Sequence, residues 1–361
     1  MMERYQTDHG HGGEIFALSE EERAQLIDFS VNINPLGLSP RGRAAVLSDF
    51  EREAGRYPDS ECRVLKQAVR AHYGVREESV TCGNGATELM YALVRALRPS
   101  AVYVPAPAFS EYRFAAEAAS VPVHSFLLDR DQGFAPADLG FLSSLPMRPL
   151  LYLGNPNNPD GQILSKSLFA QFVSAVEARG GWLVIDESFI DFLDASASFR
   201  TEIDRHPQVV ILLSLTKFYA VPGLRIGAAF SSPELARRLA GELCPWNVNG
   251  PAQRYLSEAL RDEPYIEASR AYVQEERRRM EAALRDLPGL AVCEGSVNFF
   301  LLHLTDGRDG AALAQALRPY HLKIRECGNY EGLDETFVRI AVRRREENDR
   351  MLAALKEVLT R

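Results

Sequence analysis

Between about residues 50 and 240, short apolar segments alternate with segments of helical periodicity. The apolar segments that predict strands are 79–82, 101–104, 121–128, 150–154, 182–186, 209–214 and 226–230. Strands with nearly continuous apolar runs are buried on both faces, and strand–helix alternation is typical of a sheet with helices on both sides. This pattern predicts an α/β fold built on a mostly parallel sheet.

The last third of the chain has a different pattern. A long, charged helical region follows from 251 to 287, and its Glu-Glu-Arg-Arg-Arg run at 275–279 predicts a solvated helix face. A smaller α+β unit is then predicted, with short strands and a closing helix at 291–304, 322–326, 336–342 and 344–360. A chain of 361 residues is long enough for two domains. We predict a large domain over 46–245, and linker helices with a small domain over 246–361.

One loop carries the groups that a phosphate-bearing cofactor needs. Ser214, Thr216 and Lys217 come at the end of a predicted strand, and Arg225 follows eight residues after the lysine. A partly desolvated lysine near other cations has a lowered pKa and can form a Schiff base, and hydroxyl and guanidinium groups bind phosphate. Of the five lysines, only Lys217 has such groups at loop distance. The loop predicts pyridoxal 5′-phosphate (PLP); the alternative is a strand end with a solvated lysine.

A glycine-rich turn upstream offers a second phosphate contact. The predicted strand at 79–82 leads into Gly83, and Gly85, Ala86 and Thr87 lead on into a helical pattern. Free backbone N–H groups and the positive end of a helix dipole bind phosphate at such a turn, and Thr87 adds a hydroxyl. Taken alone the indication is weak, because any glycine-rich strand–helix turn has this form.

Three further strand ends carry side chains that suit a flat, charged ring. Phe109 suits stacking on a ring face, and the amide of Asn158 suits a bond to a ring oxygen. Asp186 ends a buried strand, where a carboxylate is costly unless it has a cationic partner such as a protonated ring nitrogen. Each has an ordinary alternative, such as a core aromatic or a polar loop. Their order along the chain favours one shared site.

Together these segments resemble the fold-type I PLP enzymes, in particular the histidinol-phosphate aminotransferase group, along nearly the whole chain. The resemblance implies that Lys217 is the Schiff-base lysine and that Asp186 pairs with the ring nitrogen. It implies that Asn158 binds the ring oxygen and that Phe109 stacks on the ring. Contacts with the cofactor phosphate are implied for Gly85, Ala86, Ser214, Thr216 and Arg225, in addition to the Thr87 hydroxyl that the turn itself suggests.

The same resemblance implies a homodimer with shared active sites. In that group, a tyrosine from an Arg-Tyr-Pro segment like the one containing Tyr57 reaches the cofactor phosphate of the neighbouring subunit. The N-terminal arm, 1–45, is expected to pack with the small domain. On the substrate side, Arg339 resembles the clamp for the substrate carboxylate and Arg325 the ligand of the substrate phosphate. For Arg325, an exposed basic edge shared with Lys323 is the alternative.

Two N-terminal segments indicate one subfamily. The chain has His-Gly-His-Gly-Gly from His9 and Asn-Ile-Asn-Pro-Leu-Gly from Asn32, which resemble the opening of the threonine-phosphate decarboxylases of cobalamin biosynthesis. The resemblance implies that His9 and Asn32 complete the substrate-phosphate pocket. It also implies PLP-dependent decarboxylation of L-threonine O-3-phosphate to (R)-1-aminopropan-2-yl phosphate.

One position departs from the aminotransferase pattern. Aminotransferases of this group usually have Asp-Glu-Ala-Tyr, whereas this chain has Ser188 and Phe189 after Asp186 and Glu187. Phe189 fits the decarboxylase subfamily. A histidinol-phosphate or related aminotransferase is the alternative. A PLP-fold protein that has lost catalysis is a further alternative, and the presence of Lys217 argues against it.

Composition sets the remaining expectations. A net charge of −8 disfavours a nucleic-acid partner, and no apolar stretch reaches membrane-spanning length. The five cysteines are odd in number and lack a CxxC spacing, which predicts reduced thiols in a cytoplasmic protein and no metal site. The expected partners are a small phosphorylated amino acid and a second copy of the chain.

Overall fold

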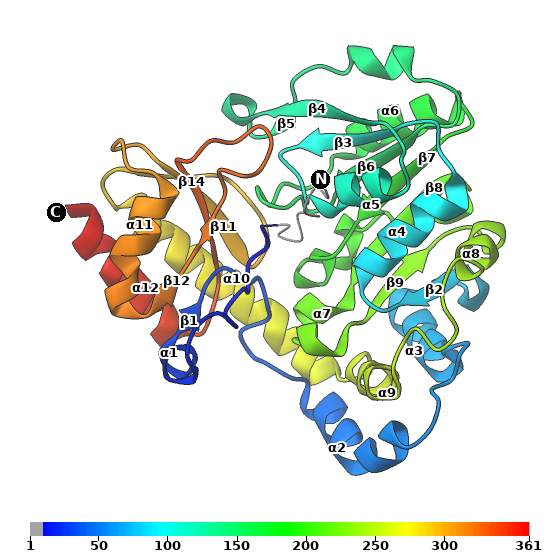
Figure 1. The fold of residues 1–361 in the computed structure, drawn as a ribbon, viewed down its shortest axis with the longest axis horizontal. Helices are drawn as coiled ribbons and strands as arrows, with labels where there is room; N and C mark the ends of the chain where they lie inside the picture. The colour runs from blue at the N-terminus through cyan, green and yellow to red at the C-terminus, as the bar shows by residue number, and fades with distance from the viewer. Residues whose placement is uncertain (1–9, 361) are drawn as a thin grey trace, which may run out of the picture.

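The computed structural model describes residues 10–360, and within them the strands form three sheets (Figure 1). The largest has eight strands in the order β2 (Val80–Gly83), β9 (Gly227–Phe230), β8 (Val209–Ser214), β7 (Trp182–Asp186), β6 (Leu150–Gly154), β3 (Val102–Ala106), β4 (Val123–Asp129) and β5 (Ala135–Pro136). Parallel ladders join β8, β7, β6, β3 and β4, whereas β9 runs antiparallel to both of its neighbours. The predicted α/β fold with a mostly parallel sheet is confirmed.

Helices cover both faces of this sheet because its strands are apolar on both sides. In β8, Val209, Ile211 and Leu213 belong to one hydrophobic core, and Val210 and Leu212 belong to another. Successive side chains of a strand point to opposite faces, so the two cores lie on opposite sides of the sheet. The first core includes residues of α3 (Arg63–Tyr73), α6 (Lys166–Glu177) and α9 (Gly250–Ala259), and the second includes residues of α4 (Ala86–Leu97), α5 (Glu111–Ala118) and α8 (Pro233–Ala240).

The C-terminal elements lie at the left of Figure 1, around a smaller antiparallel sheet. Its strand order is β10 (Leu290–Val292), β11 (Phe299–Leu304), β14 (Phe337–Ala341) and β13 (Arg325–Glu326). A separate core joins this sheet to α11 (Gly310–Leu317) and α12 (Arg345–Thr360).

Two elements connect the N-terminal and central parts of the chain to this sheet. Strand β1 (Ile27–Asp28), which follows α1 (Glu20–Gln25), pairs in parallel with β12 (Leu322–Lys323). Helix α10 (Glu263–Arg285) contributes Tyr265 to a core of the large sheet and Leu284 to the core of the small one. Figure 1 shows this helix, in yellow, extending between the two groups of elements.

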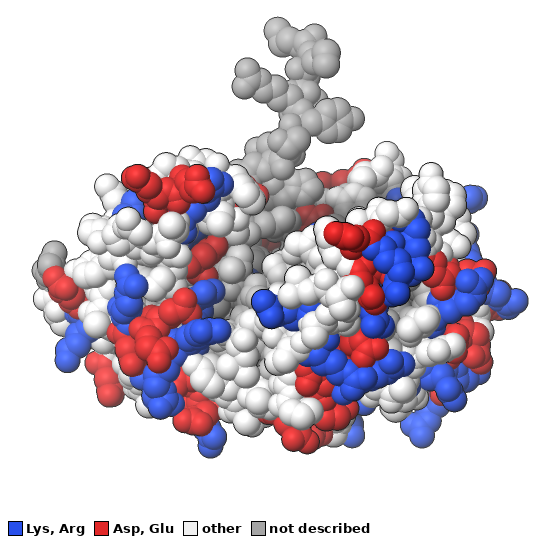
Figure 2. Space-filling view, turned by 90° about the horizontal axis from the view of Figure 1, so that it is seen from below, with Lys and Arg blue, Asp and Glu red and all other residues white. Residues whose placement is uncertain are grey.

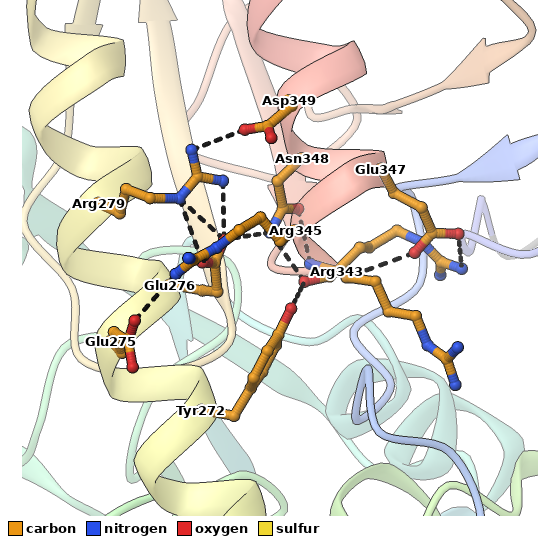
Figure 3. Close-up of polar contacts among 10 residues, drawn as sticks. Tyr272, Glu275, Glu276, Arg279, Arg343, Arg345, Glu347, Asn348 and Asp349 are labelled. Atoms are coloured by element: carbon orange, nitrogen blue, oxygen red, sulfur yellow. Dashed lines mark hydrogen bonds and ion pairs between the residues drawn. The ribbon is translucent and has the colours of Figure 1, made fainter.

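The expected solvated face at 275–279 is wrong for its second and third residues. Glu276 and Arg277 are both buried. The carboxylate of Glu276 accepts hydrogen bonds from Arg279 (2.8 Å), from Arg345 (2.6 Å) and from Asn348 (3.0 Å), as Figure 3 shows. Two of these partners belong to α12, about seventy residues further along the chain. The sequence pattern of α10 itself does not indicate these two partners.

Two further helices pack around the large sheet. Helix α2 (Pro40–Ala54) packs on α9, and the short α7 (Leu215–Phe218) directly follows β8.

The surface carries charges of both signs. On the face drawn in Figure 2, the blue and red side chains of the described residues are interspersed. Within residues 10–360, no helix is both long enough and apolar enough to cross a membrane.

Candidate active site

A pocket lies where β6, β7 and β8 end, at the edge of the large sheet where open α/β sheets bind ligands. Strands β6 and β7 end side by side, because Gly154 pairs with Asp186. The predicted residues that line the pocket are Ala86, Thr87, Phe109, Asn158, Asp186, Ser214, Lys217 and Arg225. The fold therefore brings together groups that are up to 139 positions apart, from Ala86 to Arg225.

Lys217 lies one turn beyond the end of β8, within α7. Its side chain extends into the pocket, where the pKa of the ammonium is lowered to about 8. Loss of solvent is the largest cause, the positive charges of Arg225 and Arg339 act in the same direction, and the negative charge of Asp186 opposes them. A substantial fraction of the amine is therefore neutral near pH 8, as a Schiff-base nucleophile requires.

Asp186 is the last residue of β7 and is buried. Its Oδ1 accepts hydrogen bonds from the hydroxyl and the backbone N–H of Ser188, and its Oδ2 accepts one from the hydroxyl of Tyr112 at 2.8 Å. Burial raises the pKa of the carboxyl, and these donors partly oppose that rise. Both partners line the pocket, and the sequence pattern predicted a site role for neither of them.

The start of α4 and the loop after β8 form the part of the pocket that the sequence predicts to bind a phosphate. Gly85 precedes α4 with a φ of 87°, and it has no side chain with which to cap the first N–H groups of the helix. Glycine is favoured at Gly85 because L side chains rarely adopt this φ, and the absence of a Cβ atom also leaves room for the end of the Arg225 side chain. Thr216 does not line the pocket; it is buried, and its hydroxyl lies 2.8 Å from that of Ser214, which does line it.

Two further residues of the pocket present a ring face and an amide. Phe109 meets the ring of Tyr112 edge to face, with centroids 5.8 Å apart. Oδ1 of Asn158 accepts hydrogen bonds from Arg339 and, at 3.5 Å, from Tyr330. These bonds orient the side chain so that its NH₂ group is the one that can donate to a ligand oxygen.

The two predicted substrate arginines lie on adjacent strands. Arg325 of β13 and Arg339 of β14 are direct register partners, so their side chains leave the same face of the small sheet. Arg339 is buried, donates to the backbone oxygen of Ser30 at 2.9 Å, and has no partner at Nε among the described residues. Arg325 lines a second pocket that also contains Phe109, and its Nη2 donates to Asn329 at 2.7 Å.

The N-terminal residues of the predicted substrate site are only partly described. Asn32 is buried, and its Oδ1 has no hydrogen-bond partner among residues 10–360. The chain on either side of it is fixed near the site, because Ser30 bonds Arg339 and the N–H of Asn34 donates to the carbonyl oxygen of Lys217 at 3.0 Å. His9 lies outside the described residues.

A different histidine of the same segment lies next to Phe109. Nε2 of His11 is 2.8 Å from Oε1 of the buried Glu111, and its ring centroid is 5.3 Å from that of Phe109. No role was predicted for His11, although it belongs to the His-Gly-His-Gly-Gly run that pointed to the substrate site. The run alone could not indicate which histidine approaches the pocket.

Tyr57 does not line the pocket of its own chain. Its side chain is 78% exposed and packs on the ring of Trp246, with centroids 4.6 Å apart. Any contact between Tyr57 and a cofactor would therefore involve the pocket of another subunit.

The sequence and fold match known proteins along most of the chain. Residues 24–355 match the family of class I and II aminotransferases, and the chain belongs to this family. The threonine-phosphate decarboxylase of Salmonella typhimurium is 34% identical over 93% of this chain and 92% of its own length. A bifunctional adenosylcobalamin biosynthesis protein of Leptospira interrogans is 32% identical over 96% of this chain, which spans 41% of that protein.

Two solved structures have the same fold. The histidinol-phosphate aminotransferase of Clostridium acetobutylicum has a TM-score of 0.85 and 30% identity, over 93% of this chain and 99% of its own. The L-threonine-O-3-phosphate decarboxylase of Porphyromonas gingivalis has a TM-score of 0.81 and 26% identity, over 92% of this chain and 99% of its own. The predicted fold-type I architecture is thus confirmed, and so is the prediction of an enzyme family that uses PLP.

The residues in the pocket fit PLP. The pocket offers a lysine amine with a lowered pKa and a buried carboxylate with a free acceptor position, as the aldehyde and the ring nitrogen of this cofactor require. Its other end has hydroxyls, an arginine and an uncapped helix start for a phosphate. Phe189 also lines the pocket and packs on Phe299, so a phenol that aminotransferases usually have at this position is absent.

Proposed function

We propose that this protein is a PLP-dependent decarboxylase that converts L-threonine O-3-phosphate to (R)-1-aminopropan-2-yl phosphate and carbon dioxide. The observation that carries the proposal is a pair of arginines on adjacent strands, Arg325 and Arg339, at paired register positions beside the cofactor pocket. Arg325 lines a neighbouring pocket that shares Phe109 with the cofactor pocket, and Arg339 donates a hydrogen bond to Asn158 of the cofactor pocket. A substrate with a phosphate and a carboxylate needs two such cations. The similarity to the Salmonella and Leptospira proteins supports this substrate and a place in cobalamin biosynthesis.

Each residue of the pocket then has a defined task. Nζ of Lys217 would hold the cofactor aldehyde. Asp186 would accept a hydrogen bond from the ring nitrogen, and Phe109 would pack on the ring face. Asn158 would donate to the ring oxygen. The cofactor phosphate is bound by Gly85, Ala86, Thr87, Ser214, Thr216 and Arg225.

The reaction is selected by how the substrate is held. When bound, PLP accepts the electron pair that is left on Cα after a bond to that carbon breaks. In this proposal, Arg339 would hold the substrate carboxylate so that the bond between Cα and the carboxylate is the one that breaks. The carboxylate would leave as carbon dioxide, its bonding electron pair would stay on Cα, and a proton would then be added to Cα.

Histidinol-phosphate aminotransferase activity is the second candidate. The 30% identity to the enzyme of Clostridium acetobutylicum favours it, and so does the shared requirement for a phosphate-binding arginine. Phe189 argues against it, because aminotransferases of this group usually have tyrosine there. The two reactions differ in their products, so one assay distinguishes them.

The proposal is tested by incubating the purified holoprotein with threonine phosphate and measuring carbon dioxide. We expect carbon dioxide and aminopropanol phosphate in equal amounts, with no need for an amino-group acceptor. Glutamate consumption or formation coupled to histidinol phosphate, without carbon dioxide from threonine phosphate, would instead establish the aminotransferase. Serine phosphate, which lacks only the methyl group of threonine phosphate, is assayed in parallel as the alternative substrate.

The role of Arg325 is tested by comparing two substrates. We expect Arg325→Ala to raise KM for threonine phosphate steeply, because the phosphate loses a charge-assisted partner. Any residual reaction with unphosphorylated threonine should change far less. Equal losses with both substrates would show that Arg325 supports the fold or the cofactor instead.

We further propose a cytoplasmic homodimer in which Tyr57 of one subunit reaches the cofactor phosphate of the other. The exposure of Tyr57 supports this, and so do the other exposed apolar side chains of Leu47, Phe50, Val64 and Trp246. Tyr57→Phe should weaken PLP binding by about 1.5–3 kcal/mol, the value of a hydrogen bond to a charged group. A monomer that keeps full activity on dilution would contradict the shared site.

The domain division stays a proposal of the same kind. We propose an N-terminal arm over 1–45 that packs with a small domain over 246–361, and a large cofactor-binding domain over 46–245. The pairing of β1 with β12 supports the placement of the arm.

A further inference from the structure

Two consecutive carboxylates at the end of β7 each accept a hydrogen bond from a serine hydroxyl. Ser188 Oγ lies 2.5 Å from Oδ1 of Asp186, and Ser198 Oγ lies 2.5 Å from Oε2 of Glu187. Asp186 lines the pocket, whereas Glu187 turns away from it and accepts from Asn155 and from the backbone N–H of Phe199. The two serines thus make the same kind of bond to neighbouring carboxylates, only one of which lines the pocket.

The bond to Ser188 determines which oxygen of Asp186 is open to a ligand. A carboxylate oxygen has two lone pairs, and Oδ1 already accepts from the hydroxyl and the N–H of Ser188. Oδ2 accepts only the hydroxyl of Tyr112 among the described residues, so one acceptor position remains there. Ser188 and Tyr112 both line the pocket, so Oδ2 is the oxygen that a ring nitrogen can approach.

We propose that Ser188 is a positioning residue, whose hydroxyl orients the carboxylate of Asp186 toward the cofactor ring and stabilises its ionised form. This role rests on the proposed PLP function. Aminotransferases of the group that this chain resembles usually have alanine at this position, which keeps the backbone N–H but has no hydroxyl. The hydroxyl of Ser188 is therefore an addition to the common arrangement.

The surroundings of Asp186 explain why another donor matters. Burial raises the pKa of this carboxyl, and the bonds from Ser188 and Tyr112 and the charge of Lys217 act in the opposite direction. A further neighbour is the phenol of Tyr152, which stacks on Tyr112 with centroids 4.8 Å apart and itself stays protonated. Without the Ser188 hydroxyl, the carboxylate becomes a stronger base. It then competes better for the proton it shares with the ring nitrogen, and the ring withdraws electrons less strongly.

The test compares Ser188→Ala and Ser188→Thr with Ser198→Ala, which removes the matching bond from Glu187. Each holoprotein is titrated with pH while the visible absorbance of bound PLP is followed, and its PLP dissociation constant is measured. For Ser188→Ala we expect the dissociation constant of PLP to be about tenfold higher than in the wild type, equivalent to ~1.4 kcal/mol. We also expect the midpoint of the pH titration of the PLP absorbance to lie at a higher pH. Ser188→Thr should restore both values, and Ser198→Ala should change neither.

The outcomes separate this inference from the proposed function. A wild-type protein without the absorbance of bound PLP would contradict the proposed function itself. If the wild type binds PLP and Ser188→Ala matches it in both measurements, Ser188 does not position Asp186. An equal change in Ser198→Ala would also overturn the inference, because the effect would then come from the whole strand end.

Discussion

Charged groups are buried at two places in this protein, and the two places differ in how those charges are paired. In the pocket, burial together with the charges of Arg225 and Arg339 lowers the pKa of Lys217 to about 8, and burial raises that of Asp186. Both groups are therefore shifted toward their neutral forms. Between α10 and α12, Glu276 is also buried, but three donors lower its pKa to about 2. The pocket therefore destabilises the charged forms of Lys217 and Asp186, whereas the contact between α10 and α12 stabilises the charged form of Glu276.

The difference separates a reactive site from a structural one. A buried charge without full compensation is suited to chemistry, because binding a ligand supplies the missing partner. A buried charge that is fully paired with arginine and amide donors joins two helices and leaves no position for a ligand. The direction of the pKa shift, together with the presence of a pocket, distinguishes the two roles here.

The largest effect is expected at Lys217. Lys217→Ala removes the amine that holds the cofactor, so turnover should fall by on the order of 10⁴-fold or more. Stability should not fall, because a partly desolvated cation is removed. Borohydride reduction of the wild-type holoprotein should fix a pyridoxyl group on the peptide that contains Lys217. Label on Lys66 or Lys323 would contradict the assignment.

The next effect is expected at Asp186. Asp186→Asn keeps the shape of the side chain but removes the charge that holds the ring nitrogen protonated. We expect kcat to fall roughly 10²–10³-fold, the range seen when one preorganised electrostatic partner is lost. Thermal denaturation of the apoprotein should be unchanged or shifted upward. A lowered melting temperature with a normal kcat would show that Asp186 has a structural role, like Glu276, and not a catalytic one.

Glu276 should show the opposite behaviour. Glu276→Ala leaves Arg279, Arg345 and Asn348 without their common acceptor, and the free energy of unfolding should fall by about 3 kcal/mol. Activity per folded molecule should not change. Glu275→Ala is the matched control, because Glu275 pairs with Arg345 at an exposed position and should cost less than about 1 kcal/mol. Chemical denaturation of the wild type and the two variants measures both values.

The smallest effects are those of pH. The folded-state pKa of Lys217 lies below its ordinary 10.5, so the unfolded chain binds more protons there between about pH 8 and pH 10.5. This lysine's contribution to stability therefore becomes more favourable as pH rises through that window. For Glu276 the folded-state pKa is depressed, so its contribution is present above pH 4.5 and is lost as pH falls toward 2.

Mass spectrometry of the apoprotein after brief amine acylation would measure the first of these shifts. The peptide containing Lys217 should be modified with a midpoint near pH 8, whereas a solvated lysine titrates near ~10.4. The peptide of the exposed Lys356 is the internal reference. Identical pH profiles for the two peptides would show that the pKa of Lys217 is not lowered in the pocket, and would contradict the contrast between the pocket and the paired charges around Glu276.

Much of the large sheet could be predicted from the sequence because its strands are buried on both faces. The segments 150–154, 182–186 and 209–214 each begin with four or five consecutive apolar residues, and they match β6, β7 and β8. Helix surfaces were harder to predict. Glu276 has the polarity of an exposed residue, and its burial depends on Arg345 and Asn348, which reach it only in the folded chain.

The same reasoning applies to the site. Residues that follow strand ends, such as Lys217 and Asn158, could be found because the ends of parallel strands meet at one edge of a sheet. Tyr112 and Ser188 could not be found in this way, because their roles depend on contacts with Asp186 that only the folded chain makes. The place of the N-terminal histidine beside Phe109 likewise depends on how that segment crosses the site.

In the proposed reaction, the bond between Cα and the carboxylate of threonine phosphate breaks in this pocket. The most direct measurement is the reaction of the holoprotein with threonine phosphate in D₂O, followed by NMR and by carbon dioxide release. We expect one carbon dioxide for each substrate consumed and an aminopropanol phosphate with a single deuterium on the carbon that lost the carboxylate. Deuterium on the Cα of unreacted threonine phosphate, or a keto acid whose formation requires an amino-group acceptor, with no carbon dioxide in either case, would contradict it.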